Sequence, residues 1–241
     1  MAAMTFKSTL LEKIRRLPDT GSYRFSRPSE YTFKAGQFFS ITLPSADGPL
    51  VHHFSHADSP TEKAIELTTR LTGSPFKTAL DALPVGAEVE IDGPYGLFLF
   101  NYDAPKIAFL TGGIGLTPVR SMLRYLADTK GEGRVDGQQI VLLYGSMTED
   151  GVLYKDQVDE FVQKLPGLRV AHVITKPSPT WQGYAGFINP EIVTAELGDP
   201  ASWKYYIVGP PGMIDAMWKV MHALEIPGPQ ITVEGFTGYA S

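Results

Sequence analysis

The chain has 241 residues, a formal net charge of −5 at pH 7 and no cysteine. The negative charge argues against non-specific nucleic-acid binding, which needs a basic surface. The lack of cysteine excludes disulfides, thiolate nucleophiles and cysteine-bound iron–sulfur clusters, so redox chemistry requires an organic cofactor or a metal without thiolate ligands. The sequence contains neither a signal-peptide core nor a run of about 20 apolar residues, which predicts a cytoplasmic protein that does not enter a membrane.

The part of the chain before residue 100 has the pattern of short strands separated by turns. Residues 37–43 are rich in aromatic and β-branched side chains, and residues 64–71 alternate with a period of two. Residues 85–91 repeat the alternation before the turn at Gly93–Gly96, and one short helix is expected over residues 75–83. Strands at this close spacing predict a small antiparallel β-barrel.

From residue 105 onward, apolar strands alternate with amphipathic helices, which predicts βαβ units and a parallel sheet covered on both faces. The first helix is expected to have Thr117 as its N-cap and Pro118 at its first position. The expected strands are residues 107–110, 140–144, 168–174 and 205–208, and further helices are expected over 153–165 and after Gly212. The sequence therefore predicts two domains, a β-barrel over residues 1–102 and an α/β domain over residues 103–241.

Two glycine-rich turns, Thr111–Gly115 and Gly209–Met213, follow apolar strands of the second half. Such a turn presents backbone N–H groups to an anion, and glycine lets a pyrophosphate approach the backbone. Each turn alone is equally compatible with a purely structural connection. Because open α/β sheets bind ligands at the carboxyl ends of their strands, the pair favours a shared dinucleotide site. Its candidate residues are Gly112, Gly113, Gly115, Thr117, Pro118, Gly209, Pro210, Pro211 and Met213.

The segment His52–Pro60 of the barrel half is open to three interpretations. On a strand, His52, Phe54 and His56 share one face. They could be surface histidines of a barrel strand, or His52 and His56 could bind a metal, although Phe54 would crowd the ion. In the third interpretation Phe54 stacks on a cofactor and Ser55 forms a hydrogen bond with it. The strand alone does not decide between them.

A second segment of the barrel half, Arg70–Leu80, enters the expected short helix through Gly73, Ser74 and a proline. Lys77 and Thr78 fall in the first helical turn, where a cation is poorly placed for the helix dipole unless an anion binds there. The segment therefore favours a phosphate site, and the alternative is a capped surface helix.

Taken in this order, these segments resemble the ferredoxin–NADP reductase superfamily over nearly the whole chain, and most closely small bacterial reductases with only an FAD domain and an NAD(P) domain. The resemblance implies that Phe54 lies against the isoalloxazine ring and that Ser55 lies near its N5 atom. It places His52 where the family has an arginine that binds the FAD pyrophosphate. Gly73–Leu80, with the candidate residues Gly73, Ser74, Lys77 and Thr78, match the second phosphate element of the family, and Arg70 is a further candidate just before it.

The resemblance extends to the C-terminus and to the reaction. Glu234 and Phe236 match a glutamate and an aromatic residue that covers the flavin, and Thr237–Ser241 extend beyond them. The implied reaction is hydride transfer from NAD(P)H to FAD N5, with Ser55, Glu234 and Phe236 as candidate catalytic residues and no metal. The electrons then pass to a separate acceptor, which could be ferredoxin, flavodoxin, an oxygenase component or a small molecule.

Two alternatives to this function remain from the sequence. One is a flavin electron-transfer subunit that turns over only inside an oxygenase complex, and the other is a free-flavin or ferric reductase. A monomer is expected. Because histidine is only partly charged near neutral pH, FAD affinity should be weaker than usual or depend on pH between about 6 and 8 unless Lys77 or Arg70 compensates.

The choice between NADH and NADPH depends on the loop after the second strand, residues 145–150. Ser146 and Lys155 favour a 2′-phosphate, whereas Glu149 and Asp150 would repel it. An arginine that NADPH-dependent members often place near here is missing, and the balance favours NADH.

Overall fold

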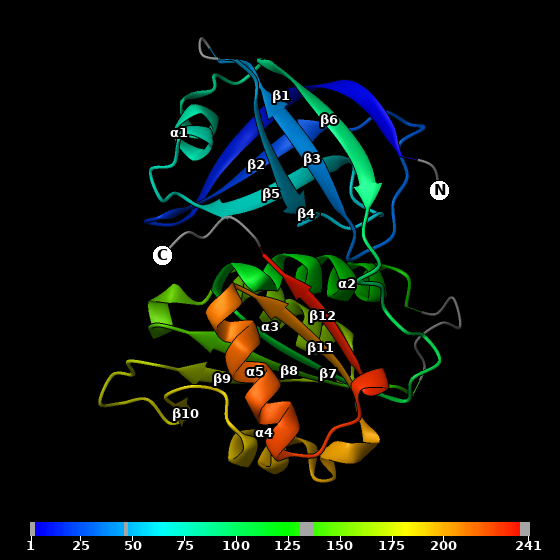
Figure 1. Cartoon of the computed structure of the whole chain (residues 1–241), viewed down its shortest axis with the longest axis vertical. Coiled ribbons are helices and arrows are strands. Elements are labelled where there is room, and N and C mark those ends of the chain that lie inside the picture. Colours follow the sequence, from blue (N-terminus) through cyan, green and yellow to red (C-terminus); the bar gives the residue numbers. More distant parts are fainter. Residues whose placement is uncertain (1–2, 46–47, 131–136, 237–241) are drawn as a thin grey trace. The chain divides into compact units, whose positions relative to one another are not determined.

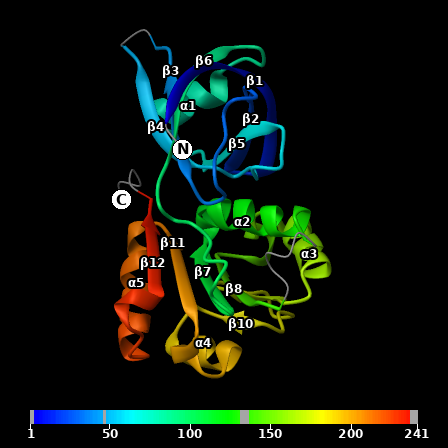
Figure 2. The ribbon, with the colours of Figure 1, turned by 90° about the vertical axis from the view of Figure 1, so that its right-hand side faces the viewer.

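The computed structural model describes residues 3–45, 48–130 and 137–236. The chain divides into two compact units, one of residues 1–100 and 117–128 and the other of residues 101–116 and 129–241. Residues 117–128 therefore group with the first unit, whereas the sequence analysis assigned them to the second domain. The domain boundary at residue 102 stays a prediction. Figure 2 shows the elements of both units from a second direction.

The first unit contains a six-stranded sheet in which all strand pairs are antiparallel, one short helix after the fifth strand, and the longer helix formed by residues 117–128 (Figure 1). The strand order is β4-β3-β6-β1-β2-β5. The elements are β1 (Met4–Leu17), β2 (Thr20–Ser26), β3 (Phe38–Leu43), β4 (Leu50–Ser55), β5 (Ala64–Arg70), α1 (Pro75–Ala82) and β6 (Glu88–Tyr95). The predicted antiparallel barrel is confirmed, and its core contains Tyr23, Phe25, Phe39, Phe54, Leu67, Phe76 and Ile91.

Helix α2 (Leu116–Asp128) packs closely against the segment before β3. Gly36 has a φ of 97°, and a Cβ there would lie 2.0 Å from the Phe98 carbonyl oxygen and 2.3 Å from Met122 Cε. Only glycine fits both the backbone conformation and this space. The buried side of α2 comprises Val119, Met122, Leu123 and Leu126, as the periodicity predicts.

The second unit is a six-stranded parallel sheet in the order β10-β9-β8-β7-β11-β12. The predicted parallel sheet is confirmed. Its strands are β7 (Lys106–Gly112), β8 (Gln139–Ser146), β9 (Leu168–Ile174), β10 (Tyr184–Ala185), β11 (Lys204–Gly209) and β12 (Ile231–Gly235). Its α-helices are α3 (Lys155–Lys164), α4 (Pro190–Leu197) and α5 (Pro211–Ala223), and 3₁₀ turns lie at Gly113–Gly115, Glu149–Gly151, Pro200–Ser202 and Gly228–Gln230.

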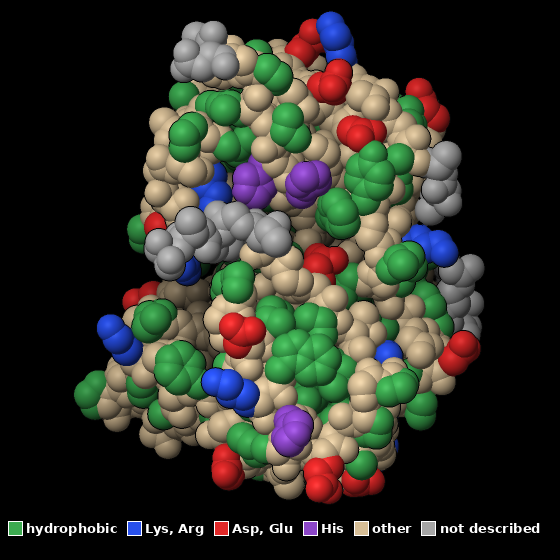
Figure 3. Space-filling view, viewed as in Figure 1, with side chains coloured by type: hydrophobic (Ala, Val, Ile, Leu, Met, Phe, Trp, Pro, Cys, Tyr) green, Lys and Arg blue, Asp and Glu red, His purple; other side chains and the backbone are tan. Residues whose placement is uncertain are grey.

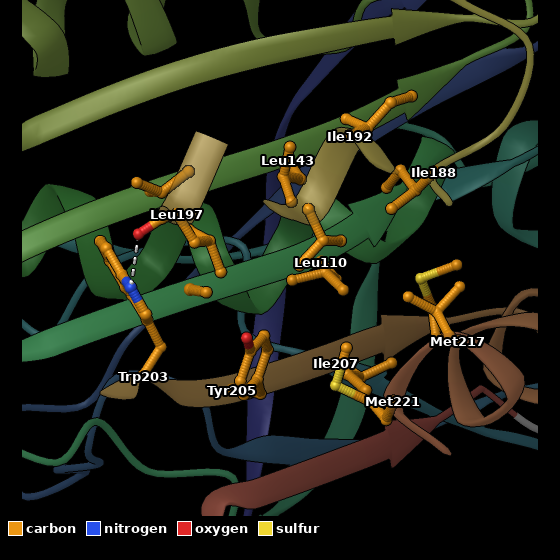
Figure 4. Packing of buried hydrophobic residues seen from close by; sticks show 14 of the residues in the cluster. Leu110, Leu143, Ile188, Ile192, Leu197, Trp203, Tyr205, Ile207, Met217 and Met221 are labelled. Atoms are coloured by element: carbon orange, nitrogen blue, oxygen red, sulfur yellow. Dashed lines mark hydrogen bonds between the residues drawn. The ribbon is translucent and has the colours of Figure 1, made fainter. Parts of the chain in front are cut away.

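One hydrophobic cluster joins the central strands of this sheet to α4 and α5 (Figure 4). Leu110 of β7, Leu143 of β8 and Ile207 of β11 contribute aliphatic side chains to it, and Met217 comes from α5. Trp203 donates its indole N–H to the Leu197 carbonyl at 3.1 Å, which satisfies the one polar group of a fully buried side chain. This packing fixes α4 and α5 against the sheet.

The start of α2 differs from the expectation. The 3₁₀ turn Gly113–Gly115 runs directly into α2, which begins at Leu116, so Thr117 lies inside the first helical turn. The prediction that Thr117 is the N-cap is therefore wrong, as is the placement of Pro118 at the first helical position. The glycines let the chain coil immediately after β7, and the backbone turn takes the place of a capping side chain. Among the described residues, no helix is long and apolar enough to cross a membrane.

Candidate cofactor sites

The glycine-rich turn of the second unit follows β7, which lies between β8 and β11 in the sheet. A Cβ on Gly115 would lie 2.5 Å from Thr111 Oγ1 and 2.5 Å from the Val208 carbonyl oxygen. Thr111 itself donates its hydroxyl to that carbonyl at 2.8 Å. The turn therefore packs directly on β11, and Gly113, with a φ of 53°, adopts a conformation that favours glycine.

Met213 of α5 brings the second glycine motif against the first. A Cβ on Gly209 would lie 2.8 Å from Met213 Sδ, and one on Gly112 would lie 3.1 Å from the same atom. Pro210 is the N-cap residue of α5, and Pro211 is its first residue. Glycine backbone and the Met213 side chain thus lie together at the carboxyl ends of β7 and β11. This arrangement fits the pyrophosphate of a dinucleotide.

Tyr144, near the end of β8, supports the turn and was not identified from the sequence. Its hydroxyl lies 3.1 Å from the Gly113 carbonyl oxygen and accepts the Leu153 N–H at 3.2 Å. It thereby links the glycine turn to the segment before α3. A buried tyrosine at the end of an otherwise aliphatic strand was the available signal, because such a hydroxyl needs a polar partner.

The predicted C-terminal residues lie at the same edge of this sheet. Glu234 of β12 pairs in register with Val208 of β11. The Phe236 N–H donates to the Gly209 carbonyl at 3.1 Å. Both residues therefore lie beside the Gly209–Met213 turn, and their roles at the flavin stay predictions. Residues 237–241 lie outside the described residues.

The loop after β8 uses several of its polar groups internally. Ser146 donates its hydroxyl to the Gly151 carbonyl at 2.8 Å. The Glu149 carboxylate accepts the Ser178 N–H at 2.8 Å, and Lys155 pairs with Asp159 at 2.6 Å. The two groups predicted to favour a 2′-phosphate, Ser146 and Lys155, are thus engaged with other partners.

In the first unit, the predicted phosphate element is the start of α1. Ser74 is its N-cap and accepts the Lys77 N–H at 3.4 Å, which confirms the capped entry to the helix. Lys77 is only 3% exposed, and its amine lies 3.3 Å from the Thr72 hydroxyl. Burial, followed by the charge of Arg70, lowers the pKa of Lys77. A buried cation beside hydroxyls at a helix N-terminus fits a phosphate of FAD.

Arg70 and Thr78 lie at the edges of this element. Arg70 is half-exposed and pairs with Asp19 at 3.1 Å. Thr78 is exposed, and its N–H donates to the Ser74 carbonyl at 2.9 Å. Gly73 has a φ of 75°, which allows the turn between β5 and α1. The structure therefore brings Arg70, Gly73, Ser74, Lys77 and Thr78 together along one short segment.

Strand β4 places His52 and Phe54 next to Phe76 of α1, whereas His53 contacts Phe38. The rings of His52 and Phe54 are stacked with centroids 4.7 Å apart, and Phe54 also lies 5.6 Å from the Phe76 ring. Burial lowers the pKa of His52, the hydrogen bond with the His53 carbonyl opposes this, and the charge of Lys77 lowers it further. Figure 3 shows histidine side chains gathered on this face of the first unit. Ser55, at the end of β4, is buried.

His56, by contrast, is neither a surface histidine nor a partner of His52. It is fully buried, with Nε2 at 3.0 Å from the Tyr31 hydroxyl and Nδ1 at 2.9 Å from Asp58 Oδ1. Its ring stacks on Phe33 at a centroid distance of 3.7 Å. Both ring nitrogens are used inside the barrel, so pairing His56 with His52 as metal ligands does not fit the structure. The chain leaves the strand geometry after Ser55, which places His56 in the core.

Comparison with known proteins agrees with this arrangement. Residues 109–219 match the family described as Oxidoreductase NAD-binding domain. NADH-cytochrome b5 reductase 1 of Pyricularia oryzae is 30% identical over 215 residues, which are 84% of this chain and 69% of that protein. The chain belongs to the ferredoxin–NADP reductase superfamily. A ferredoxin NADP⁺ reductase from Neisseria gonorrhoeae, solved with bound FAD and NADP, shares the fold with a TM-score of 0.81 at 21% identity, covering 96% of this chain and 98% of that one.

Other relatives extend the comparison. The reductase component of phenol 2-monooxygenase from a Pseudomonas species is 31% identical over 190 residues, which are 76% of this chain and 52% of that protein. The matched region of the cytochrome b5 reductases ranges from 48% to 75% of their length. A cytochrome P450 reductase from Amycolatopsis shares the fold with a TM-score of 0.85 at 23% identity, covering 99% of this chain and 71% of that one. Superfamily members of this type pass electrons to a separate acceptor.

Proposed function

We propose that this chain oxidises NADH with bound FAD and delivers the electrons to a separate redox protein. The observation that carries the proposal is the glycine-lined edge of the parallel sheet, where Gly115 packs on β11 without a side chain. Backbone N–H groups at such an edge bind a pyrophosphate. The buried Lys77 at the start of α1 supports the flavin half.

Each predicted residue has a role in this proposal. The Gly113–Gly115 turn and the start of α2 bind the dinucleotide pyrophosphate, and Lys77 with His52 binds that of FAD. When bound, FAD accepts a hydride from the nicotinamide, leaving NAD⁺, and its two electrons then pass to the acceptor. By the resemblance, Phe54 and Ser55 would contact the flavin, Glu234 would adjust the charge near it, and Phe236 would cover its ring and give way to the nicotinamide.

The preference for NADH is supported by the loop after β8. A 2′-phosphate needs cationic or hydroxyl donors, but the Ser146 hydroxyl is donated to Gly151 and Lys155 is paired with Asp159. Glu149, held by the Ser178 N–H, adds a negative charge at the same loop. This loop therefore accommodates the 2′-hydroxyl of NADH more readily than the 2′-phosphate of NADPH.

The acceptor is proposed to be a one-electron redox protein. The relatives named above are a reductase of cytochrome b5 and the reductase component of a phenol monooxygenase, and both names point to protein acceptors. The relation to the oxygenase reductase favours an oxygenase component. The monomeric state and the cytoplasmic location stay predictions, to be checked by light scattering and by cell fractionation.

The proposal is tested with the purified protein loaded with FAD. We expect a yellow protein whose flavin absorbance is bleached by NADH without oxygen, and a higher kcat/KM for NADH than for NADPH with ferricyanide as acceptor. Ferricyanide reduction by the isolated chain would exclude a subunit that works only inside a complex. Loss of FAD on gel filtration would favour a free-flavin reductase, and absence of bleaching by either dinucleotide would contradict the proposal.

A further inference from the structure

The segment directly after β4, residues 56–59, is a buried loop. Its four side chains are almost completely inaccessible, from 0% for His56 to 1% for Asp58. Loops normally lie at the surface, because buried backbone groups need hydrogen-bond partners. Here the His56 N–H donates to the Gln37 carbonyl at 2.9 Å, and the Ala57 N–H donates to the Glu66 carbonyl at 2.8 Å.

Side chains of α2 bind two carbonyl groups of this loop. The Arg120 guanidinium donates to the Ala57 carbonyl, and the Ser121 hydroxyl donates to the Asp58 carbonyl. Arg120 is 1% exposed and also holds the Glu62 carboxylate, with Nη2 at 2.9 Å from Oε1. All of these residues belong to the first unit. The loop is therefore fastened to the helix by charged and neutral hydrogen bonds.

The opposite side of the loop is fastened to the barrel. Asp58 Oδ1 lies 2.9 Å from His56 Nδ1 and accepts the Glu66 N–H at 2.8 Å, and His56 in turn lies 3.0 Å from the Tyr31 hydroxyl. Burial alone raises the pKa of Glu62, but the hydrogen bonds and charge of Arg120 lower it overall. Glu62 is therefore ionised beside Arg120 at neutral pH.

The position of this loop in the chain gives it a consequence for the reaction. It starts one residue after Ser55, the candidate neighbour of the flavin, and Arg120 lies five positions after Gly115 of the dinucleotide turn. Buried ion pairs are often no more stabilising than apolar packing, so their value lies in fixing one geometry. Hydride transfer is sensitive to displacements of about 1 Å.

We propose that Arg120 and Ser121 are positioning residues for hydride transfer, because they hold the Ala57 and Asp58 carbonyls and thereby fix Ser55 relative to the first turn of α2. This inference rests on the proposed function. Arg120 acts through the backbone of the loop and need not touch either cofactor. Replacing the forked guanidinium of Arg120 should therefore slow the reduction of the flavin by NADH, even in protein that still contains FAD.

The test compares Arg120→Lys, Ser121→Ala and the control Thr61→Val in FAD-loaded protein. The Thr61 hydroxyl donates to Asp128 at the far end of α2 and lies 2.7 Å from Ser59 Oγ at the end of the loop, so its loss removes contacts of similar kind but leaves the Ala57 and Asp58 carbonyls with their partners on α2. The readouts are the limiting rate of flavin reduction by NADH in stopped flow, the FAD content, and amide hydrogen exchange of residues 56–59. Ser121→Ala removes a single hydrogen bond and keeps the test informative if Arg120→Lys does not fold.

We expect Arg120→Lys to lower the limiting rate about 10-fold and Ser121→Ala about 3-fold at full FAD content. The amides of His56 and Ala57 should exchange faster in both variants, and Thr61→Val should match the wild type. Unchanged limiting rates in FAD-loaded variants would overturn this inference alone. A wild type whose FAD is not reduced by NADH or NADPH would overturn the proposed function as well.

Discussion

The two units differ in the groups that make up their proposed cofactor sites. In the second unit the proposed site is mainly backbone, because a Cβ on Gly115 would meet the Val208 carbonyl, whereas Gly112 and Gly209 pack against the Met213 side chain. In the first unit the proposed site depends on two titratable side chains, His52, which stacks on Phe54, and the buried Lys77. A site formed by backbone tolerates few substitutions. At a site formed by side chains, single substitutions can change the affinity for the cofactor and its pH dependence.

The backbone site should show the largest mutational effect. In Gly115→Ala the new Cβ would meet Thr111 Oγ1 and the Val208 carbonyl, both at 2.5 Å, so the turn must move away from β11. We expect kcat/KM for NADH to fall about 100-fold or more while FAD content stays unchanged. Steady-state kinetics with ferricyanide measure this effect.

The control for that prediction is Gly228→Ala, also in the second unit. A Cβ at Gly228 has no heavy atom within 4 Å, so its kinetics should match those of the wild type. If Gly115→Ala keeps normal kinetics too, the close packing of this turn is not what the dinucleotide site needs.

The glycine turns were predictable from the sequence because everything that defines them is local. The strands at 140–144 and 168–174 were predictable for the same reason, since continuous apolar runs reveal buried parallel strands. Strands β1 and β2 were not delimited, because charged residues such as Arg15 and Arg24 interrupt their alternation and find partners only in the folded barrel. Helix α4 was also missed, although Asn189 and Pro190 mark its start.

The roles of His56 and Arg120 could not be predicted, because their partners are distant in sequence. Tyr31 precedes His56 by 25 residues, and Glu62 lies 58 residues before Arg120. The two-residue period of a strand predicts that His56 lies on the same face as His52. Because β4 ends at Ser55, His56 lies in the core instead. The flavin half of the site was therefore identified from a resemblance, whereas the dinucleotide half could be argued from the residues themselves.

Within the barrel unit, His56→Leu should cause the largest loss of stability. It would leave the Tyr31 hydroxyl and the Asp58 carboxylate buried without their shared partner, and Asp58 Oδ2 already has no partner among the described residues. We expect the free energy of unfolding to fall by about 2–4 kcal/mol. Urea denaturation followed by far-UV circular dichroism at a fixed FAD concentration measures it.

His53→Leu is the matched comparison, because this neighbouring histidine is exposed. Its unfolding free energy should stay within about 0.5 kcal/mol of the wild type. Equal stability of His56→Leu and His53→Leu would show that the buried Tyr31–His56–Asp58 hydrogen bonds contribute nothing net.

A smaller effect is expected at His52, on FAD affinity. Because the pKa of His52 is lowered by burial and then by Lys77, the side chain is mostly neutral at pH 7 in the FAD-free protein. A bound pyrophosphate favours its protonated form, so FAD affinity should rise as the pH falls from about 8 to 5.5. His52→Arg keeps its charge, and its affinity should be about 10-fold tighter at neutral pH and independent of pH.

FAD titrations of the apo-protein by flavin fluorescence quenching measure both properties of His52. His52→Gln, which carries no charge, should bind FAD weakly at all pH values. Equal FAD affinity of the wild type at both ends of this pH range would show that Lys77 alone supplies the charge that the pyrophosphate needs.

The smallest effect is expected for dinucleotide choice at the loop after β8. Met147 is 54% exposed and follows Ser146, whose hydroxyl is donated to Gly151. Met147→Arg adds a permanent cation where a 2′-phosphate is predicted to lie, and we expect kcat/KM for NADPH to rise about 5-fold with little change for NADH, since solvent screens an exposed charge. Met147→Gln, of similar length but uncharged, should leave both values unchanged. If Met147→Arg raises kcat/KM for both dinucleotides, or for neither, the 2′ position of the dinucleotide lies away from this loop. Glu149 would then not account for a preference for NADH.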